Sequence, residues 1–376
     1  MKAGVGRAAM PITTGRRTCT GLSLIELLIA MTLGLLIVAA LGQLYRGSSQ
    51  TYRLNETQSQ INENGRFAID FLSSDLRMAG YLSCGGPSAR IGNSVNATGH
   101  WLYSTRGIEG FEGGVDTLPE ELDGEARNGT DVLILRHTAV DVERTLVEAD
   151  NGGAIMNLGL RHPFQTGEIL VVSNPSCTQT ALFQVTRVVN TNDDEATDVF
   201  DAIEHDNDAA TATVSPGNCS AALFGSFDCT TPGKAQSGTY PRGSVVNRYA
   251  VHAYYISASD PPTLARKRLS HHGGLATIAT DKLVRDVENM QILYGRDTTN
   301  DGDDSVDDYV TANQVTDWEQ VISVRFALLM RSADKRVRAA ADQQTFTLLD
   351  TTVISPNDAH LRRVLGGLVA LRNHLP

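Results

Sequence analysis

The chain has 376 residues, of which 41% are hydrophobic and 20% are charged, and its formal net charge is −11. This acidic balance argues against a nucleic-acid partner, because phosphate binding needs a basic surface. Beyond a membrane-length segment near the N-terminus, the length allows one large domain or two small ones.

The first 44 residues consist of a basic leader and an apolar run. Residues 1–21 carry four basic residues and no acid, which is typical of a flank retained in the cytoplasm. Residues 22–44 are apolar apart from a few small or uncharged polar residues and Glu26. A helix of this length is about 34 Å long and can span a bilayer. Because a carboxylate is costly inside a membrane, Glu26 predicts a specific partner there.

This layout resembles the class III signal of type IV prepilins, in which a basic leader and a glycine precede a hydrophobic helix with an acid at its fifth position. The resemblance implies that a membrane prepilin peptidase cuts between Gly21 and Leu22. Leu22 then becomes the N-methylated first residue, where the family usually has Phe, and Glu26 becomes the fifth. Two alternatives are a secretory signal peptide cleaved near Ala40-Leu41-Gly42 and a plain transmembrane anchor.

The helix is expected to continue beyond the membrane segment. Residues 45–79 contain no proline, and their apolar residues recur at spacings of seven, four and three, which predicts an amphipathic stripe. The stripe consists of Leu54, Ile61, Ala68, Leu72, Leu76 and Ala79. We expect Phe71, Leu72 and Leu76 to pack in a core. Gly80 and the Cys84-Gly85-Gly86-Pro87 cluster end the helix.

The rest of the chain, 80–376, is predicted to form one β-rich domain. Runs rich in β-branched and aromatic residues predict strands, and no regular βαβ alternation occurs. The fold class is therefore α+β: a long N-terminal helix, membrane-spanning in 22–44 and amphipathic in 45–79, packed on mostly antiparallel strands. The strand-like runs are Asp131–His137, Glu168–Ser173, Ala181–Val189, Ser244–Ser257, Asn289–Tyr294 and Val321–Arg331, and residues 91–128 are expected to be irregular.

Cysteine usage fits an oxidising periplasm. Cys19 lies in the leader, and four cysteines remain after its removal, which fits two disulfides. Proximity favours Cys219 with Cys229, which leaves Cys84 for Cys177, although three connectivities are open. No CxxC spacing occurs, which argues against a zinc site or a redox-active dithiol formed by cysteines.

Two acidic segments stand out. Residues 188–233 have nine acids and no Lys or Arg, which predicts a solvated, mobile insertion near 190–233. The second segment, 297–308, has Gly302 at the sixth place, as in an EF-hand, but lacks the final Glu, and its flanks favour strands. It is either a calcium-binding turn or an exposed acidic hairpin that binds no ion. The calcium ligands would be Asp297, Asp301, Asp303, Asp307 and Asp308.

No motif for catalysis is present: the sequence lacks G-x-S-x-G, H-E-x-x-H, a Walker A loop and a dinucleotide fingerprint. The pair His271-His272 precedes two glycines and is expected in a solvated turn, because adjacent residues on a strand point to opposite faces. We therefore expect a protein that is not an enzyme and requires no cofactor.

The C-terminal third carries a second resemblance. Residues 283–310, 317–332 and 361–373 are similar to the C-terminal region of PilW-type minor pilins, and so is the segment 169–186. The resemblance implies a pilin-like minor pilin that primes or caps type IV pilus assembly. Its partners would be other minor pilins, the major pilin, the tip adhesin, the prepilin peptidase and the inner-membrane assembly platform.

The same resemblance implies a single-pass inner-membrane protein with its C-terminal domain in the periplasm, later incorporated into the pilus filament or its tip. Two other functions stay open. One is a J-type minor pseudopilin of type II secretion, and the other is a membrane-tethered periplasmic adhesin or sensor.

Overall fold

The computed structural model describes most of the chain. Residues 140 and 141 are described by their backbone alone. The described residues are 21, 23–83, 89–97, 99–150, 152–159, 162–189, 201–207, 215–231, 233, 235–236, 238–299, 305–335, 337–338 and 340–374.

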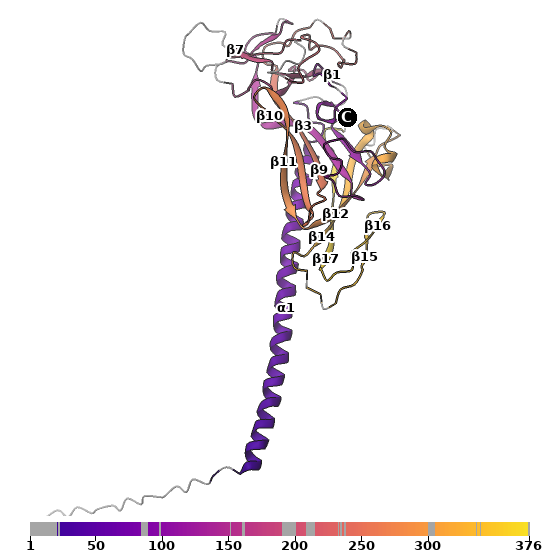
Figure 1. The fold of residues 1–376 in the computed structure, drawn as a ribbon. Helices are drawn as coiled ribbons and strands as arrows, with labels where there is room; N and C mark the ends of the chain where they lie inside the picture. The colour runs from indigo at the N-terminus through magenta and orange to yellow at the C-terminus, as the bar shows by residue number, and fades with distance from the viewer. Residues whose placement is uncertain are drawn as a thin grey trace, which may run out of the picture. The chain divides into compact units, whose positions relative to one another are not determined.

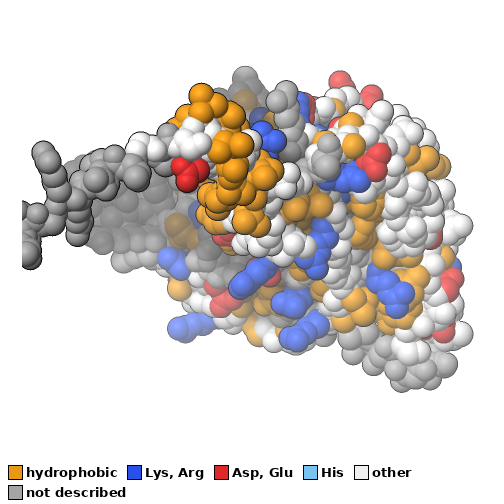
Figure 2. Space-filling view, turned by 90° about the horizontal axis from the view of Figure 1, so that it is seen from below, with side chains coloured by type: hydrophobic (Ala, Val, Ile, Leu, Met, Phe, Trp, Pro, Cys, Tyr) orange, Lys and Arg blue, Asp and Glu red, His pale blue; other side chains and the backbone are white. Residues whose placement is uncertain are grey.

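The chain divides into two compact units, Met1–Asn55 and Glu56–Pro376, and the helix α1 (Leu24–Met78) contributes to both. In the first unit, the helix supplies nearly all the described residues. An 18-residue window of α1 has a hydropathy of 2.6, and none of it is buried, so its length and composition are sufficient to cross a membrane. Figure 2 shows hydrophobic side chains gathered on the end of α1 that faces the viewer.

In the second unit, one face of α1 is buried along the predicted stripe. The buried helical residues are Ile61, Gly65, Ala68, Leu72 and Leu76, at spacings of three and four. These spacings place the side chains on one side of a helix, so the predicted stripe is confirmed here.

The prediction that Phe71 is a core residue is wrong, because its side chain is 40% exposed. Phe71 lies one position from Leu72, about 100° around the helix axis, and therefore off the buried face. The helix ends at Met78, followed by Gly80 with φ 77°. This left-handed conformation suits glycine and ends the helix near the predicted position.

The largest sheet forms one layer of the second unit, and Figure 1 shows β9, β10 and β11 side by side in it. Its strands run in the order β1, β6, β5, β9, β10 and β11, while β3 also pairs with β9 and β2 pairs with β3. The bounds are β1 (Arg90–Asn93), β2 (Ile108–Phe111), β3 (Val132–Thr145), β5 (Ile169–Ser173), β6 (Gln179–Gln184), β9 (Val245–Ile256), β10 (Thr263–His272) and β11 (Leu275–Arg285).

A second sheet has the order β13, β12, β14 and β17, and two small sheets complete the described strands. The small sheets are β4–β8–β7 and the hairpin β15–β16. Among the described strands every pair is antiparallel except β1 with β6. The bounds are β4 (Ile155–Asn157), β7 (Arg187–Val189), β8 (Ala202–Glu204), β12 (Val287–Arg296), β13 (Asp308–Val310), β14 (Val321–Arg331), β15 (Thr345–Leu348), β16 (Thr351–Ile354) and β17 (Arg362–Ala370).

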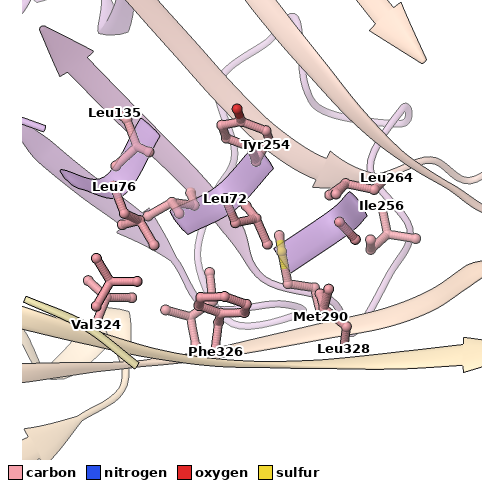
Figure 3. Packing of buried hydrophobic residues seen from close by; sticks show 14 of the residues in the cluster. Leu72, Leu76, Leu135, Tyr254, Ile256, Leu264, Met290, Val324, Phe326 and Leu328 are labelled. Atoms are coloured by element: carbon pink, nitrogen blue, oxygen red, sulfur yellow. The ribbon is translucent and has the colours of Figure 1, made fainter. Parts of the chain in front are cut away.

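The main hydrophobic core lies where the two larger sheets meet α1. Figure 3 shows Leu72 and Leu76 between Leu135 and Tyr254 on one side and Val324 and Phe326 on the other. The first pair comes from β3 and β9 and the second from β14. The helix stripe is thus enclosed by both sheets, and the expected α+β arrangement of a long helix on a mostly antiparallel domain is confirmed.

The strand predictions agree best for buried strands. The run Val321–Arg331 coincides with β14, whereas Ala181–Val189 is divided between β6 and β7. The β10–β11 hairpin was not predicted, because many of its residues are polar and only partly buried. Its turn contains Gly273 and Gly274, both at positive φ. His271 and His272, which were expected in a solvated turn, are instead the last two residues of β10, next to this turn.

The interpretation of 188–233 as a solvated insertion is wrong for several of its described residues, which are buried, although 230, 231 and 233 are exposed. The strand β8 pairs with both β4 and β7, and Ile203 belongs to a buried cluster. His205 and Asn218 are also buried. Of the dense acidic stretch, 191–208, residues 201–207 are described and contain β8, whereas 191–200 and 208 lie outside the described residues. Because the segment as a whole is acidic, its composition favoured a loop, and the short apolar strand β8, which pairs with β4 and β7, was not predicted.

The central place of Leu72 gives a stability prediction. Leu72 is 0% exposed, so Leu72→Ala should lower the free energy of unfolding by about 2–5 kcal/mol through lost burial and a residual cavity. The matched control is Leu368→Ala, because Leu368 is 61% exposed and its truncation should cost about 0.5 kcal/mol or less. Denaturant unfolding followed by circular dichroism measures both. Equal losses in the two variants would contradict the enclosed position of α1.

Candidate functional site

The N-terminal motif lies at the start of α1, where Glu26 takes part in a helix cap. The backbone N–H of Ser23 donates to Oε2 of Glu26 at 3.0 Å, and the N–H of Ile25 donates to Oγ of Ser23 at 3.4 Å. These bonds supply acceptors to N–H groups that a helix start leaves without partners. Gly21 precedes the cap and is exposed, whereas Leu22 and the leader 1–20 lie outside the described residues.

The cap gives Glu26 a local role that the sequence interpretation missed. A carboxylate at a helix N-terminus is stabilised by the helix dipole and by the N–H groups of the first turn. The signal was present as Ser23-Leu24-Ile25-Glu26, which matches the S-x-x-E pattern of a capping box. Any intersubunit role of Glu26 therefore has to be separated by experiment from this effect within its own helix.

The three described cysteines of the second unit are disulfide-bonded. Cys219 and Cys229 are joined, with Cα atoms 5.7 Å apart, and this is the pair that sequence proximity favoured. Cys177 is also disulfide-bonded. Cys84 lies outside the described residues, so its pairing with Cys177 stays a prediction.

The acidic loop is described only at its two ends. Asp307 accepts hydrogen bonds from the backbone of Thr298 at 2.7 Å and of Thr299 at 3.1 Å. Asp308 pairs with Arg296 at 2.6 Å. Asp297 also has an interaction, whereas Asp301 and Asp303 lie outside the described residues. The carboxylates of Asp307 and Asp308 thus have partners within the chain, and calcium binding by this loop stays a prediction.

A polar cluster lies at the end of the helix stripe, where α1 meets β3 and β9. Asp75 of α1 accepts hydrogen bonds at Oδ2 from Nδ1 of His252, at 2.5 Å, and from the hydroxyl of Tyr254. His137 of β3 stands beside them, with its ring 5.3 Å from that of His252. One ligand atom from each of Asp75, His137 and His252 lies within 4.8 Å of the others. This group could hold a metal ion.

The electrostatics of the cluster favour a charged Asp75 and a neutral His137. Burial raises the pKa of Asp75, but hydrogen bonds from His252 and Tyr254 and the charge of His252 outweigh it and lower this pKa to about 2. Burial lowers the pKa of His137. Nη1 of Arg266 lies 3.6 Å from Oδ2 of Asp75 and adds a positive charge. The carboxylate thereby ties α1 to two strands of the sheet.

The sequence could not indicate this cluster. His137 and His252 stand 62 and 177 residues from Asp75, and no ligand spacing links them. The pairing of β3 with β9 and the docking of α1 bring them together. By contrast, the structure leaves the pair His271-His272 at the tip of the β10–β11 hairpin, with His272 exposed.

Comparison with known proteins identifies one related segment. The model of the family described as Type IV Pilus-assembly protein W matches residues 253–373. This segment runs from within β9 to just beyond β17 and contains all four strands of the sheet that packs against Leu72 and Leu76. No curated protein matches the chain. The match supports a role in type IV pilus assembly.

The polar cluster gives a second stability prediction. Asp75→Ala removes the acceptor of Tyr254 and His252 and should lower the free energy of unfolding by about 1–3 kcal/mol, the cost of leaving buried polar groups unpaired. The matched control is Asp70→Ala on the same helix, because Asp70 is exposed and lies 3.9 Å from Arg66, a pair worth about 0.3–0.5 kcal/mol. Denaturant midpoints report both, and a control as damaging as Asp75→Ala would rule out the anchoring role.

Proposed function

We propose that this chain is a minor pilin that primes or caps type IV pilus assembly. The observation that carries the proposal is the pairing of two independent features: a prepilin-like N-terminus and a C-terminal match to the type IV pilus-assembly family. The first feature alone is shared by many pilin-like proteins, and the second alone concerns a third of the chain. Together they favour a pilus subunit over an ordinary membrane-anchored protein.

The proposed life cycle starts in the inner membrane. The apolar portion of α1 anchors the chain, with the leader in the cytoplasm and the second unit in the periplasm. Prepilin peptidase cuts between Gly21 and Leu22, and the amine of Leu22 is methylated. The Cys219–Cys229 disulfide and the disulfide-bonded Cys177 suit this oxidising compartment.

Assembly then depends on charge pairing inside the membrane. The new amine of Leu22 is positive, and Glu26 of a neighbouring subunit supplies the opposite charge. In a low dielectric this attraction is strong, and an unpaired charge is penalised. The pair sets the axial register, while exposed apolar side chains of residues 24–44 exchange lipid contacts for helix contacts.

The proposed partners are other minor pilins, the major pilin, a tip adhesin, the prepilin peptidase and the inner-membrane assembly platform. A second unit of 321 residues, Glu56–Pro376, is large for a subunit repeated along a thin filament. This size favours a place at the pilus tip or in an initiating complex.

Leader processing gives the first functional prediction. When the chain is co-produced with a prepilin peptidase, mass spectrometry should find N-methylated Leu22 at its start. Gly21→Val should block the cut, because a branched side chain then stands at the cleavage position, and the product should keep its 21 leader residues. The matched control is Gly47→Val, which puts the same side chain on an exposed position of α1 and should be processed normally.

A fully processed Gly21→Val protein would overturn the prepilin assignment. A membrane-tethered adhesin or sensor would keep its leader even in the unmodified chain, so the same measurement separates that alternative. Loss of pili, as opposed to loss of protein secretion, on deletion of the chain separates a pilin from a pseudopilin.

Glu26 gives the second functional prediction, designed to separate its two roles. Glu26→Gln removes the charge but keeps a side-chain oxygen for the N–H of Ser23, as glutamine also completes a capping box. Ser23→Ala does the opposite, since it removes one cap and keeps the charge. If Glu26 pairs with a neighbour's amine, Glu26→Gln should be processed but absent from sheared pili, and Ser23→Ala should be incorporated.

Immunoblots of cell and pilus fractions measure both outcomes. Normal incorporation of Glu26→Gln, together with failure of Ser23→Ala, would assign Glu26 to the local cap and refute its part in the register.

A further inference from the structure

We propose that Asp75, His137 and His252 form a binding site for a divalent transition-metal ion, with Zn²⁺ as the probe, which fastens the end of α1 to β3 and β9. Two imidazoles and one carboxylate are ligands that suit zinc and its neighbours in the first transition row. The site lies entirely within the second unit and differs from the acidic loop in both position and ligand type.

The strand register places the two histidines on the sheet face that meets α1. Leu135 of β3 pairs with His252 of β9, and His137 pairs with Ala250. Alternate residues of a strand share a face, so His137 follows Leu135 and lies diagonally across from His252. Leu135 and Tyr254 both belong to the core against the helix. His137 lies two residues from Leu135 on β3, and His252 lies two residues from Tyr254 on β9, so both histidines are on the same sheet face.

The helix supplies the third ligand from the same side. Asp75 follows the buried Leu72 by three positions, which places both on one face of α1. Figure 3 shows the hydroxyl of Tyr254 pointing away from Phe326 and Leu328, out of the apolar part of the core. This hydroxyl donates to Asp75, so the cluster begins where the apolar packing ends.

An unsatisfied nitrogen points to a missing ligand. His137 is 7% exposed, and its Nε2 is buried without a hydrogen-bond partner. Its Nδ1 lies 2.9 Å from the carbonyl oxygen of Thr138. This bond places the proton on Nδ1 and leaves a lone pair on Nε2, the arrangement found in metal-bound histidines. Burying such an atom unpaired is unfavourable, and a metal ion would satisfy it.

The surrounding charges are compatible with a cation. Arg266 approaches Asp75, but its other nitrogen binds Asp281 at 2.9 Å. Arg268, opposite His252 in the register, also binds Asp281, at 3.1 Å. Asp281 therefore offsets one of the two positive charges of these arginines. Asp75 supplies the negative charge that faces the ion.

Metal binding requires a small opening of the cluster. Nδ1 of His252 and Oδ2 of Asp75 are 2.5 Å apart, whereas two ligands at about 2.0 Å from one tetrahedral zinc lie roughly 3.3 Å apart. The ion would replace this hydrogen bond. Both side chains are partly exposed, at 15% and 17%, so they can move apart, and water can fill the fourth position.

Zinc binding by the full-length chain in detergent micelles tests the proposal. After removal of metals with EDTA, calorimetric titration should give one saturable Zn²⁺ site per chain, and zinc should raise the unfolding temperature. Co²⁺ should produce the visible absorption bands of a tetrahedral site with nitrogen and oxygen ligands. His137→Gln should weaken zinc affinity by more than the roughly 10- to 100-fold expected for loss of a group outside the coordination sphere.

The matched control is His272→Gln, which changes an exposed histidine at the tip of the β10–β11 hairpin and should leave zinc affinity unchanged. His252→Gln is the second test variant in case His137→Gln does not fold. The absence of saturable zinc binding in the unchanged chain would overturn the proposal. Undiminished binding in folded His137→Gln or His252→Gln would also overturn it, because the ion would then lie elsewhere.

Discussion

Burial of one stripe of α1 between two sheets is the interaction on which the second unit depends. Leu72 and Leu76 contact residues of β3 and β9 on one side and of β14 on the other. The helix stripe and residues of both sheets share one buried hydrophobic cluster, and loss of the helix would expose part of it to water. The helix residues from Ile61 to Leu76 therefore pack against both larger sheets, and the family-matched segment, 253–373, contributes β10 and β11 to one sheet and all four strands of the other.

The polar cluster completes this interaction at the end of the stripe. Apolar burial is non-directional and does not by itself fix how far a helix slides along a sheet. The hydrogen bonds of Asp75 with His252 and Tyr254 are directional, and they fix one position along the sheet. A metal ion at the same place would strengthen this constraint with three bonds that meet at one point.

The two portions of α1 differ in whether their apolar side chains are exposed or buried. Residues up to Asn55 expose apolar side chains widely, which suits lipid or neighbouring helices, whereas residues from Glu56 onward bury a narrow stripe against their own domain. A subunit that must leave a membrane and enter a filament needs both the exposed apolar surface and the buried stripe. The exposed surface exchanges lipid for neighbouring helices, while the buried stripe keeps the domain folded. The cap formed by Ser23 and Glu26 closes the end of the helix at which the proposed leader is removed.

The amino-acid sequence determined the helix, its buried stripe and the buried strands such as β14, because periodicity and apolar runs are local properties. It also contains the N-terminal motif in residues 21–26, and the S-x-x-E capping pattern in residues 23–26, which was not used to predict the cap. Only the tertiary structure decided that Phe71 faces solvent, that β8 is held by β4 and β7, and that Asp75, His137 and His252 meet. The physical reason is that these features depend on contacts between segments far apart in the chain, and no spacing within one segment records them.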